Sequence, residues 1–438
     1  MNANPFTRAT LVAVLAMAVG FTMTRIAPPP RPADPVSPAP DSREYIVHWP
    51  TGTAAALADM DGVTVLSTPG SDELAKLGAF VVTVDSGASI DAILAAGAEY
   101  VEPNATFTSQ DAGPAGKLAP LAADPLLGQQ WHHATIGDAR AWAVSEGAGV
   151  RVAVVDSGVG PHEELSVVGG KDFTGGDGQW TDQYGHGTHV AGLCCGRRDN
   201  GRGGAGVAPR ADVLSVRVLR SDGQGTLGAI ASGIVWAADQ GAKVINLSLG
   251  GNSGTPTLQE ALAYARSRGA LPVCAAGNDW STRPMWPAAY DDCLSVGSSD
   301  RADRSSPFTN RHTSIDISAP GEGMLSSCIG GEYCQMDGTS MAAPLVSGAA
   351  ALLFATGMRD PAAVSWRLRS TAAARPAVQS GKRLDVGAAL VVRQTPAPTL
   401  RPAFTLTPTP IIGARIVPVV VPPGCRVVVL CQEPYPRP

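Results

Sequence analysis

The feature that most constrains the fold is a series of short apolar runs between about residues 130 and 391. Five of them are "VRVAVVDSG", "ADVLSVRVL", "AKVINLSLG", "GALPVCAAGN" and "CLSVGSSD", and helical stretches such as "GAIASGIVWAADQG" separate them. Because the runs do not alternate strictly between apolar and polar residues, they are typical of strands buried on both faces. They predict an α/β fold with a mostly parallel sheet sandwiched by helices, whose chemistry gathers at the carboxyl ends of the strands.

The rest of the chain divides into further segments. Residues 25–43 are a proline-rich linker that cannot form a core. Residues 44–110 begin with the strand-like "EYIVHW" and continue with "SDELAKLG", "AFVVTVD" and "SIDAILAAG", an order that predicts a small α+β domain. The main domain is expected over residues 111–391. Residues 392–438 are again proline-rich, with a valine-rich stretch that could close into a small disulfide hairpin.

The N-terminus indicates export. Residues 1–24 carry one arginine before an apolar run from Leu11 to Met23. A run of this length suits a cleaved signal peptide better than a membrane-spanning helix, which needs about 20 apolar residues. An uncleaved anchor is the alternative, and only then would the protein contact a membrane. We therefore expect a secreted or cell-surface protein.

The cysteine content agrees with export, because an even number of cysteines in an exported chain usually forms disulfides. The sequence has eight cysteines. Three pairs are candidate bridges: Cys328 with Cys334, Cys425 with Cys431, and Cys274 with Cys293. Adjacent Cys194 and Cys195 cannot easily bond each other, and two small buried thiols are at least as good an interpretation. The pairing among Cys194, Cys195, Cys274 and Cys293 stays open.

Composition limits the function. The net charge of −5 and the pI near 5.8 argue against nucleic acid as a partner, because phosphate binding requires a basic surface. Hydrophobic residues make up 44% of the chain, which is enough for a sizeable core. Functional residues are therefore sought at the ends of the predicted strands.

Four polar residues lie at the ends of predicted elements: Asp156, His186, Asn278 and Ser340. Each has an unremarkable interpretation, because Asp-Ser-Gly and Gly-Asn are turn sequences and a serine at a helix start is usually an N-cap. His186 and His189 do not match the zinc-binding HExxH spacing, so a metal site there is disfavoured. Taken together, the four supply what peptide hydrolysis needs: a nucleophile, a base, a group that orients the base, and an oxyanion donor.

The surrounding sequences, "VVDSGV", "GHGTHVAG", "AAGN" and "GTSMAAP" in this order, resemble the active-site motifs of the subtilisin-like serine proteases. The resemblance extends from about Leu127 to Leu390. It implies a serine endopeptidase in which Asp156 orients His186 and His186 takes the proton from Ser340. Asn278 and the backbone N–H of Ser340 would form the oxyanion hole. His189 would have a structural role and take no part in catalysis.

Two further stretches resemble the substrate cleft of this family. "SLGG" would pair with the substrate backbone through Ser248, Leu249 and Gly250, opposite the wall of Ala275, Ala276 and Gly277. "SDGQG", with Gly223 and Gly225, would supply the second edge strand, so that the substrate adds as a strand between them. Plain glycine turns are the alternative for both. Met285 would stand at the floor of the first specificity pocket, where many members have a small residue, and would favour small or medium apolar P1 side chains.

The segment 44–110 resembles the inhibitor-type propeptide of the same family, with "EYIVHW" near its start and "YVEPN" near its end. The resemblance implies a precursor whose propeptide assists folding, inhibits the enzyme and is then cut off, here between about residues 105 and 122. No cofactor is implied for the chemistry. Structural calcium is common in the family, but Asp199 and Asn200 lie among three arginines, so no metal site is assigned.

We therefore expect a monomeric, secreted endopeptidase that acts on polypeptides and is inhibited by its own propeptide. Two other classes of protein remain alternatives. One is a catalytically silent relative that binds through the cleft or the propeptide. The other is a surface-anchored structural or adhesion protein, which the proline-rich ends suggest.

Overall fold

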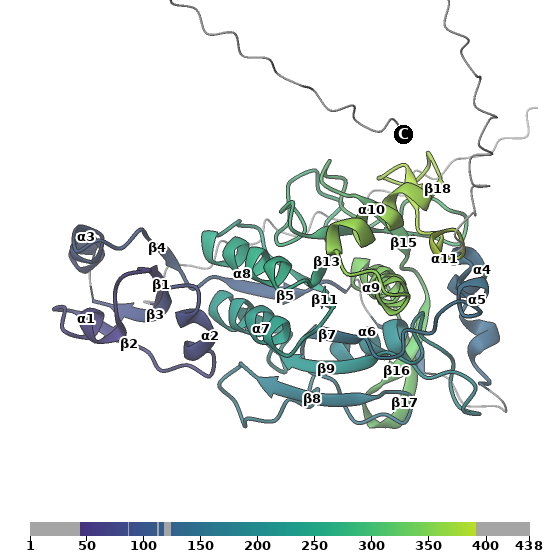
Figure 1. Ribbon diagram of the computed structural model, residues 1–438, viewed down its shortest axis with the longest axis horizontal. Coiled ribbons are helices and arrows are strands. Elements are labelled where there is room, and N and C mark those ends of the chain that lie inside the picture. Colours follow the sequence, from purple (N-terminus) through teal and green to yellow (C-terminus); the bar gives the residue numbers. More distant parts are fainter. Residues whose placement is uncertain (1–43, 86, 112–113, 118–123, 391–438) are drawn as a thin grey trace, which may run out of the picture. The chain divides into compact units, whose positions relative to one another are not determined.

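The computed structural model describes residues 44–85, 87–111, 114–117 and 124–390 (Figure 1). Three predictions lie outside these residues: the signal peptide, the first linker, and the C-terminal segment with the bridge between Cys425 and Cys431. Among the described residues, no helix is both long enough and apolar enough to cross a membrane.

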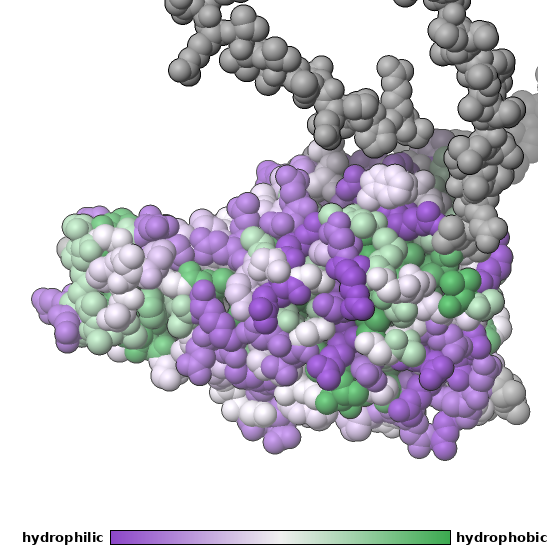
Figure 2. Space-filling view, in the orientation of Figure 1, coloured by the Kyte–Doolittle hydropathy of each residue, from purple (hydrophilic) through white to green (hydrophobic). Residues whose placement is uncertain are grey.

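Residues 44–103 form a small antiparallel α+β domain, as the sequence predicts. Its sheet has the strand order β2-β3-β1-β4. The four strands are β1 (Glu44–His48), β2 (Val63–Val65), β3 (Ala79–Val84) and β4 (Tyr100–Pro103). The helices are α1 (Ala54–Ala58), α2 (Ser71–Ala75) and α3 (Gly87–Ala95). Val47, Leu57, Val82 and Ile93 lie in a core of its own. Figure 2 shows many apolar residues on the surface of this domain, where α1 and α3 are rich in alanine.

The main domain is built on a nine-stranded sheet with the order β18-β19-β15-β14-β13-β11-β7-β9-β8. All neighbouring strands are parallel except β18 and β19. The strands are β7 (Arg151–Asp156), β8 (Val167–Asp172), β9 (Asp212–Arg217), β11 (Val244–Leu247), β13 (Leu271–Ala275), β14 (Leu294–Ser299), β15 (Ile317–Pro320), β18 (Ala373–Ala374) and β19 (Lys382–Arg383).

Helices cover both faces of this sheet, which confirms the predicted fold class. α6 (His186–Cys195) and α9 (Thr339–Ala355) pack on one face, and α7 (Leu227–Asp239) and α8 (Pro256–Ser267) pack on the other (Figure 1). Side chains of β7 alternate between the two cores: Val152 and Val154 contact the first, and Ala153 and Val155 the second. The run "RVAVVD" therefore looks continuous in sequence because both faces are buried. The remaining helices are α4 (His132–Ile136), α5 (Asp138–Ala141), α10 (Pro361–Thr371) and α11 (Val386–Leu390), with 3₁₀ turns at Leu127–Gln129 and Ile329–Gly331.

Two small sheets lie beside the large one. In the first, β5 (Thr106–Ser109) lies between β10 (Gln224–Thr226) and β12 (Leu249–Gly250) and is antiparallel to both. In the second, β17 (Glu332–Met336) lies between β16 (Met324–Cys328) and β6 (Pro114–Lys117). Both sheets thus join the segment that follows the small domain to strands of the main domain.

Two of the predicted disulfides are present, Cys274–Cys293 and Cys328–Cys334. The first joins the end of β13 to the residue before β14, and the second closes the β16–β17 hairpin. Cys194 and Cys195 are free thiols buried in α6, which is the simpler of the two interpretations of this pair.

Candidate active site

Asp156 and His186 are in direct contact at the carboxyl edge of the large sheet. Asp156 is the last residue of β7, and His186 is the first residue of α6. The Nδ1 atom of His186 lies 2.7 Å from Oδ1 of Asp156. Both side chains are buried. The other ring nitrogen, Nε2, has no hydrogen-bond partner among the described residues, so it is the atom left for proton transfer.

The surroundings of His186 favour its protonated form. Burial, the largest influence, lowers the pKa of this imidazole. The charge of Asp156 and the hydrogen bond with it act in the opposite direction, as do the charges of Asp111 and Asp182. The net result is a pKa above the usual value for histidine.

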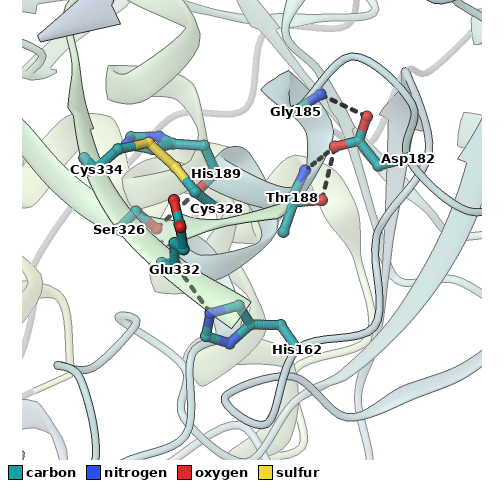
Figure 3. Close-up of a disulfide and its surroundings, with 9 residues drawn as sticks. All are labelled: His162, Asp182, Gly185, Thr188, His189, Ser326, Cys328, Glu332 and Cys334. Atoms are coloured by element: carbon teal, nitrogen blue, oxygen red, sulfur yellow. Dashed lines mark hydrogen bonds between the residues drawn. A yellow bond between two sulfur atoms is a disulfide. The ribbon is translucent and has the colours of Figure 1, made fainter. Parts of the chain in front are cut away.

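The carboxylate of Asp182 holds the start of α6 in place. Its Oδ1 accepts hydrogen bonds from the N–H of Gly185 at 2.8 Å and from the hydroxyl of Ser157 at 2.9 Å. Its Oδ2 accepts from both the N–H and the hydroxyl of Thr188, at 2.9 and 2.6 Å (Figure 3). The sequence interpretation missed this residue, although an acidic side chain just before a helix start is a known capping signal.

Ser340 is the second residue of α9, and the residue that precedes the helix as its N-cap is Gly338. The interpretation of Ser340 as an N-cap is therefore wrong. Ser340 Oγ donates to the carbonyl oxygen of Ser248 at 3.2 Å, and its backbone N–H donates to the carbonyl oxygen of Gln110 at 3.1 Å.

Asn278 presents its amide nitrogen at the same place. Its Oδ1 accepts from the N–H and the hydroxyl of Thr339, at 2.9 and 3.0 Å, and these contacts fix the orientation of the side chain. Its Nδ2 is buried and has no partner among the described residues. A Cβ atom placed on Gly338 would lie 2.7 Å from the Gln110 oxygen and 3.3 Å from this Nδ2, so the three groups adjoin one small space.

β5 lies between the two stretches predicted to bind substrate. On one side, Phe107 pairs with Gly225, and the Ser109 N–H donates to the oxygen of Gly223 at 3.1 Å. On the other side, Leu249 pairs with Ser109 and Gly250 with Thr108, and the Gln110 N–H donates to the oxygen of Ser248 at 3.2 Å. A segment of the chain itself therefore occupies the predicted cleft as an added strand.

Met285 lies between the two walls predicted for the first pocket. A Cβ atom on Gly250 would lie 2.7 Å from its sulfur, and one on Gly277 would lie 2.5 Å from it. Ala275 ends β13, and the Ala276 oxygen accepts from the side chain of Asn310 at 3.0 Å. The residues predicted to line the first pocket, Gly250, Gly277 and Met285, therefore lie together.

His189 and the loop after α6 have structural contacts. Burial and the charge of His186 lower the pKa of His189 to about 3, and its Nε2 lies 3.2 Å from the Cys334 oxygen. The N–H groups of Asp199 and Asn200 donate to the carboxylate of Asp124. In the described part of the chain, no group of three or more potential metal-ligating side chains is present.

Comparison with known proteins agrees with this geometry. The sequence profile of the subtilase family (Peptidase_S8) matches residues 147–383, more than half of the chain. The protein belongs to the subtilase family. It is a subtilisin-like serine endopeptidase, and the chemistry of subtilases needs no cofactor.

Individual subtilases are similar over about half of this chain. Thermitase of Thermoactinomyces vulgaris is 45% identical over 221 residues, which are 50% of this chain and 79% of thermitase. Subtilisin BL of Lederbergia lenta is 42% identical over 207 residues, 47% of this chain and 77% of that protein. Among solved structures, a protease of Pseudoalteromonas arctica is 33% identical with a TM-score of 0.57, and the match covers 61% of this chain and 98% of that one.

Proposed function

We propose that this subtilase is a secreted precursor that cleaves itself and then hydrolyses polypeptides with Asp156, His186, Ser340 and Asn278. The observation that carries the proposal is the hydrogen bond from the Ser340 N–H to the Gln110 oxygen, beside the unpartnered Nδ2 of Asn278. Two donors around one carbonyl oxygen are what an oxyanion hole requires.

In the proposed reaction, Ser340 Oγ attacks the carbonyl carbon of the substrate while Nε2 of His186 accepts its proton. Asp156 holds Nδ1 of the imidazole and stabilises the imidazolium that forms. The Ser340 N–H and Asn278 Nδ2 stabilise the negative oxygen. The imidazolium then protonates the leaving amine, an ester of Ser340 remains, and water hydrolyses it with His186 again as the base.

We assign residues 44–110 as the inhibitory propeptide and the bond between Gln110 and Asp111 as the self-cleavage site. This narrows the interval of about 105 to 122 expected from the sequence. Support comes from the Gln110 oxygen at the proposed oxyanion hole and from the charge of Asp111, which acts on His186. Residues 111–391 would be the catalytic domain.

Contacts with α7 and α8 support the inhibitory role. Asn104 Oδ1 accepts from the N–H of Gly228 at 2.9 Å, and Glu102 Oε1 accepts from the N–H of Thr257 at 3.0 Å. Each carboxylate or amide oxygen thus binds an N–H in the first turn of a helix, where such groups lack partners within the helix. Phe107 is also buried, in the same cluster as Leu249.

The substrate pocket is proposed to be shallow. The sulfur of Met285 fills the space between Gly250 and Gly277, so small or medium P1 side chains should fit better than Phe or Tyr. Gln110, the proposed P1 residue of the precursor, is of medium size, and its amide donates to the oxygen of Thr108 at 3.3 Å.

Export by residues 1–24, a monomeric state and action on polypeptides outside the cell are part of the proposal. Its test is mass spectrometry of the secreted product of the wild type and of Ser340→Ala. The wild type should begin at Asp111, and the variant should keep residues 44–110. A variant processed at the same bond would show that another protease cuts it. Failure of a fluorophosphonate to label wild-type Ser340 would favour the catalytically silent alternative.

A further inference from the structure

The chain does not leave the main domain after the proposed cleavage site. Asp111 follows Gln110, and three residues further on the chain forms β6, which pairs antiparallel with β17. The paired residues are Pro114 with Met336, Ala115 with Gln335, and Lys117 with Cys334, with an irregularity between the last two pairs. In protease nomenclature these chain residues are P4′, P5′ and P7′, because they follow the cleaved bond.

β17 is the central strand of this small sheet, and on the side away from β6 it is firmly held. Its partner β16 pairs with it over five residues, from Met324 with Met336 to Cys328 with Glu332. The disulfide between Cys328 and Cys334 closes this hairpin (Figure 3). The hairpin is tied to α6 as well, because Ser326 Oγ donates to the His189 oxygen at 2.8 Å and His189 Nε2 lies 3.2 Å from the Cys334 oxygen.

β17 is also connected directly to the catalytic helix. Only Asp337 and Gly338 separate Met336 from α9, which carries Ser340 as its second residue. Asp337 accepts a hydrogen bond from the N–H of Gly323, just before β16. The edge of β17 that pairs with β6 therefore has a fixed position relative to Ser340.

The sequence of β6 indicates that it binds β17 through its backbone rather than through its side chains. "PAGK" contains no β-branched or aromatic residue, which are the residues that usually stabilise a strand through side-chain packing. An edge strand exposes unpaired N–H and C=O groups, and any extended peptide can pair with them. β17 would offer the same groups to another chain when β6 is absent.

We propose that β17 is an extended binding strand for the primed side of substrates, which holds residues P4′ to P7′ by backbone pairing. The inference rests on the proposed cleavage site between Gln110 and Asp111. It identifies the preferred substrate as an unfolded polypeptide that continues for at least seven residues beyond the cleaved bond. Short peptides would use only the cleft between β10 and β12.

The test compares two synthetic peptides on the mature enzyme. Both contain residues 106–113 of this chain, and the longer one continues with residues 114–117. The enzyme carries Ala115→Pro and Gly116→Pro, so that its own segment cannot pair with β17. Two to three backbone hydrogen bonds should raise kcat/KM of the longer peptide by about tenfold, mainly through KM. The products, identified by mass, show where each peptide is cut.

A second series distinguishes strand pairing from simple attraction. Single N-methyl groups are placed in turn at P5′, P6′ and P7′ of the longer peptide. If the peptide pairs with β17 as a strand, the three methyl groups should have different effects on kcat/KM. The tenfold gain should be lost only where the methylated N–H would face β17. Equal kcat/KM for the two peptides, or an equal effect of all three methyl groups, would overturn the inference. Absence of any cut after Gln110 would instead contradict the proposed function.

Discussion

The backbone N–H of Ser340 lies 3.1 Å from the carbonyl oxygen of Gln110 and donates a hydrogen bond to it. These two residues are far apart in the sequence, and their contact places a peptide bond of the chain itself beside the serine that we propose as the nucleophile. Because a carbonyl oxygen gains negative charge during attack, the same hydrogen bond would strengthen along the reaction. The predictions below follow from this arrangement and from its surroundings.

Replacing Asn278 should slow catalysis without unfolding the protein. In Asn278→Asp, the oxygen that accepts from Thr339 is kept, but the N–H donor is lost. We expect the rate of precursor cleavage to fall by about 10²–10³-fold, the usual effect of removing one oxyanion donor. The rate is measured by electrophoresis of freshly refolded precursor, and circular dichroism checks the fold. Unchanged cleavage would show that Nδ2 does not act in the oxyanion hole.

The pH dependence of precursor cleavage should respond to Asp111. Its negative charge contributes to the raised pKa of His186, and cleavage requires the neutral imidazole. In Asp111→Asn this pKa falls, so the acidic limb of the pH–rate profile should move to lower pH. Asp111→Glu keeps the charge and is the matched control. If the profile of Asp111→Asn overlaid that of the control, Asp111 would not act on His186.

Removing the Met285 side chain should change the P1 preference. In Met285→Gly, the space between Gly250 and Gly277 opens. We expect kcat/KM for Phe at P1, relative to Ala, to rise by about tenfold or more, because filling an apolar pocket discriminates by this amount. Peptides that differ only at P1 measure it. A wild type that already prefers Phe or Tyr strongly over Ala and Leu would refute the shallow pocket.

His132 should make the protein less stable in acid. Its ring is fully buried, and neither nitrogen has a partner among the described residues. Burial, followed by the charges of His133 and His189, lowers its pKa well below the usual value of 6.5. The unfolded chain therefore binds a proton below pH 6.5 that the folded protein does not, and stability is lost as the pH falls.

The variant His132→Leu tests this sign. Unfolding temperatures are measured in the inactive Ser340→Ala background. The difference between the variant and its parent should shift in favour of the variant as the pH is lowered from 8 to 5. His312→Leu is the control, because His312 is only partly buried and Ser314 provides it with a hydrogen-bond partner at 2.8 Å. A difference in unfolding temperature that does not vary with pH would contradict the prediction.

Much of the fold follows from the hydrophobic pattern. The runs around Val154, Leu214 and Val273 predict central strands because both of their faces are buried. Weaker elements were not predicted. β8 has the sequence "VVGGKD", with two glycines, and α1 buries only Leu57. Their formation depends on neighbouring strands and helices rather than on local sequence.

The residues of the candidate site that lie at strand ends could be predicted from the sequence. Those that are positioned by tertiary contacts were harder to predict. Asp156 follows an apolar strand, so its place at the sheet edge could be inferred. The start of the helix that carries Ser340 could also be inferred, but its contact with Asn278 could not, because Asn278 accepts from the N–H of Thr339 across 61 residues. The role of Gln110 likewise depends on β10 and β12, which follow it in the sequence by more than a hundred residues.

The pairing of β5 with both β10 and β12 restricts which proteins this enzyme can cut. A segment held in this way exposes the two edges of its backbone to the protease at once. In helices and inner strands of a folded protein, the backbone N–H and C=O groups already form hydrogen bonds within that protein. Such elements would have to unfold locally before they could bind between β10 and β12. How readily a region unfolds locally, more than the identity of its residues, should therefore decide where a folded protein is cleaved.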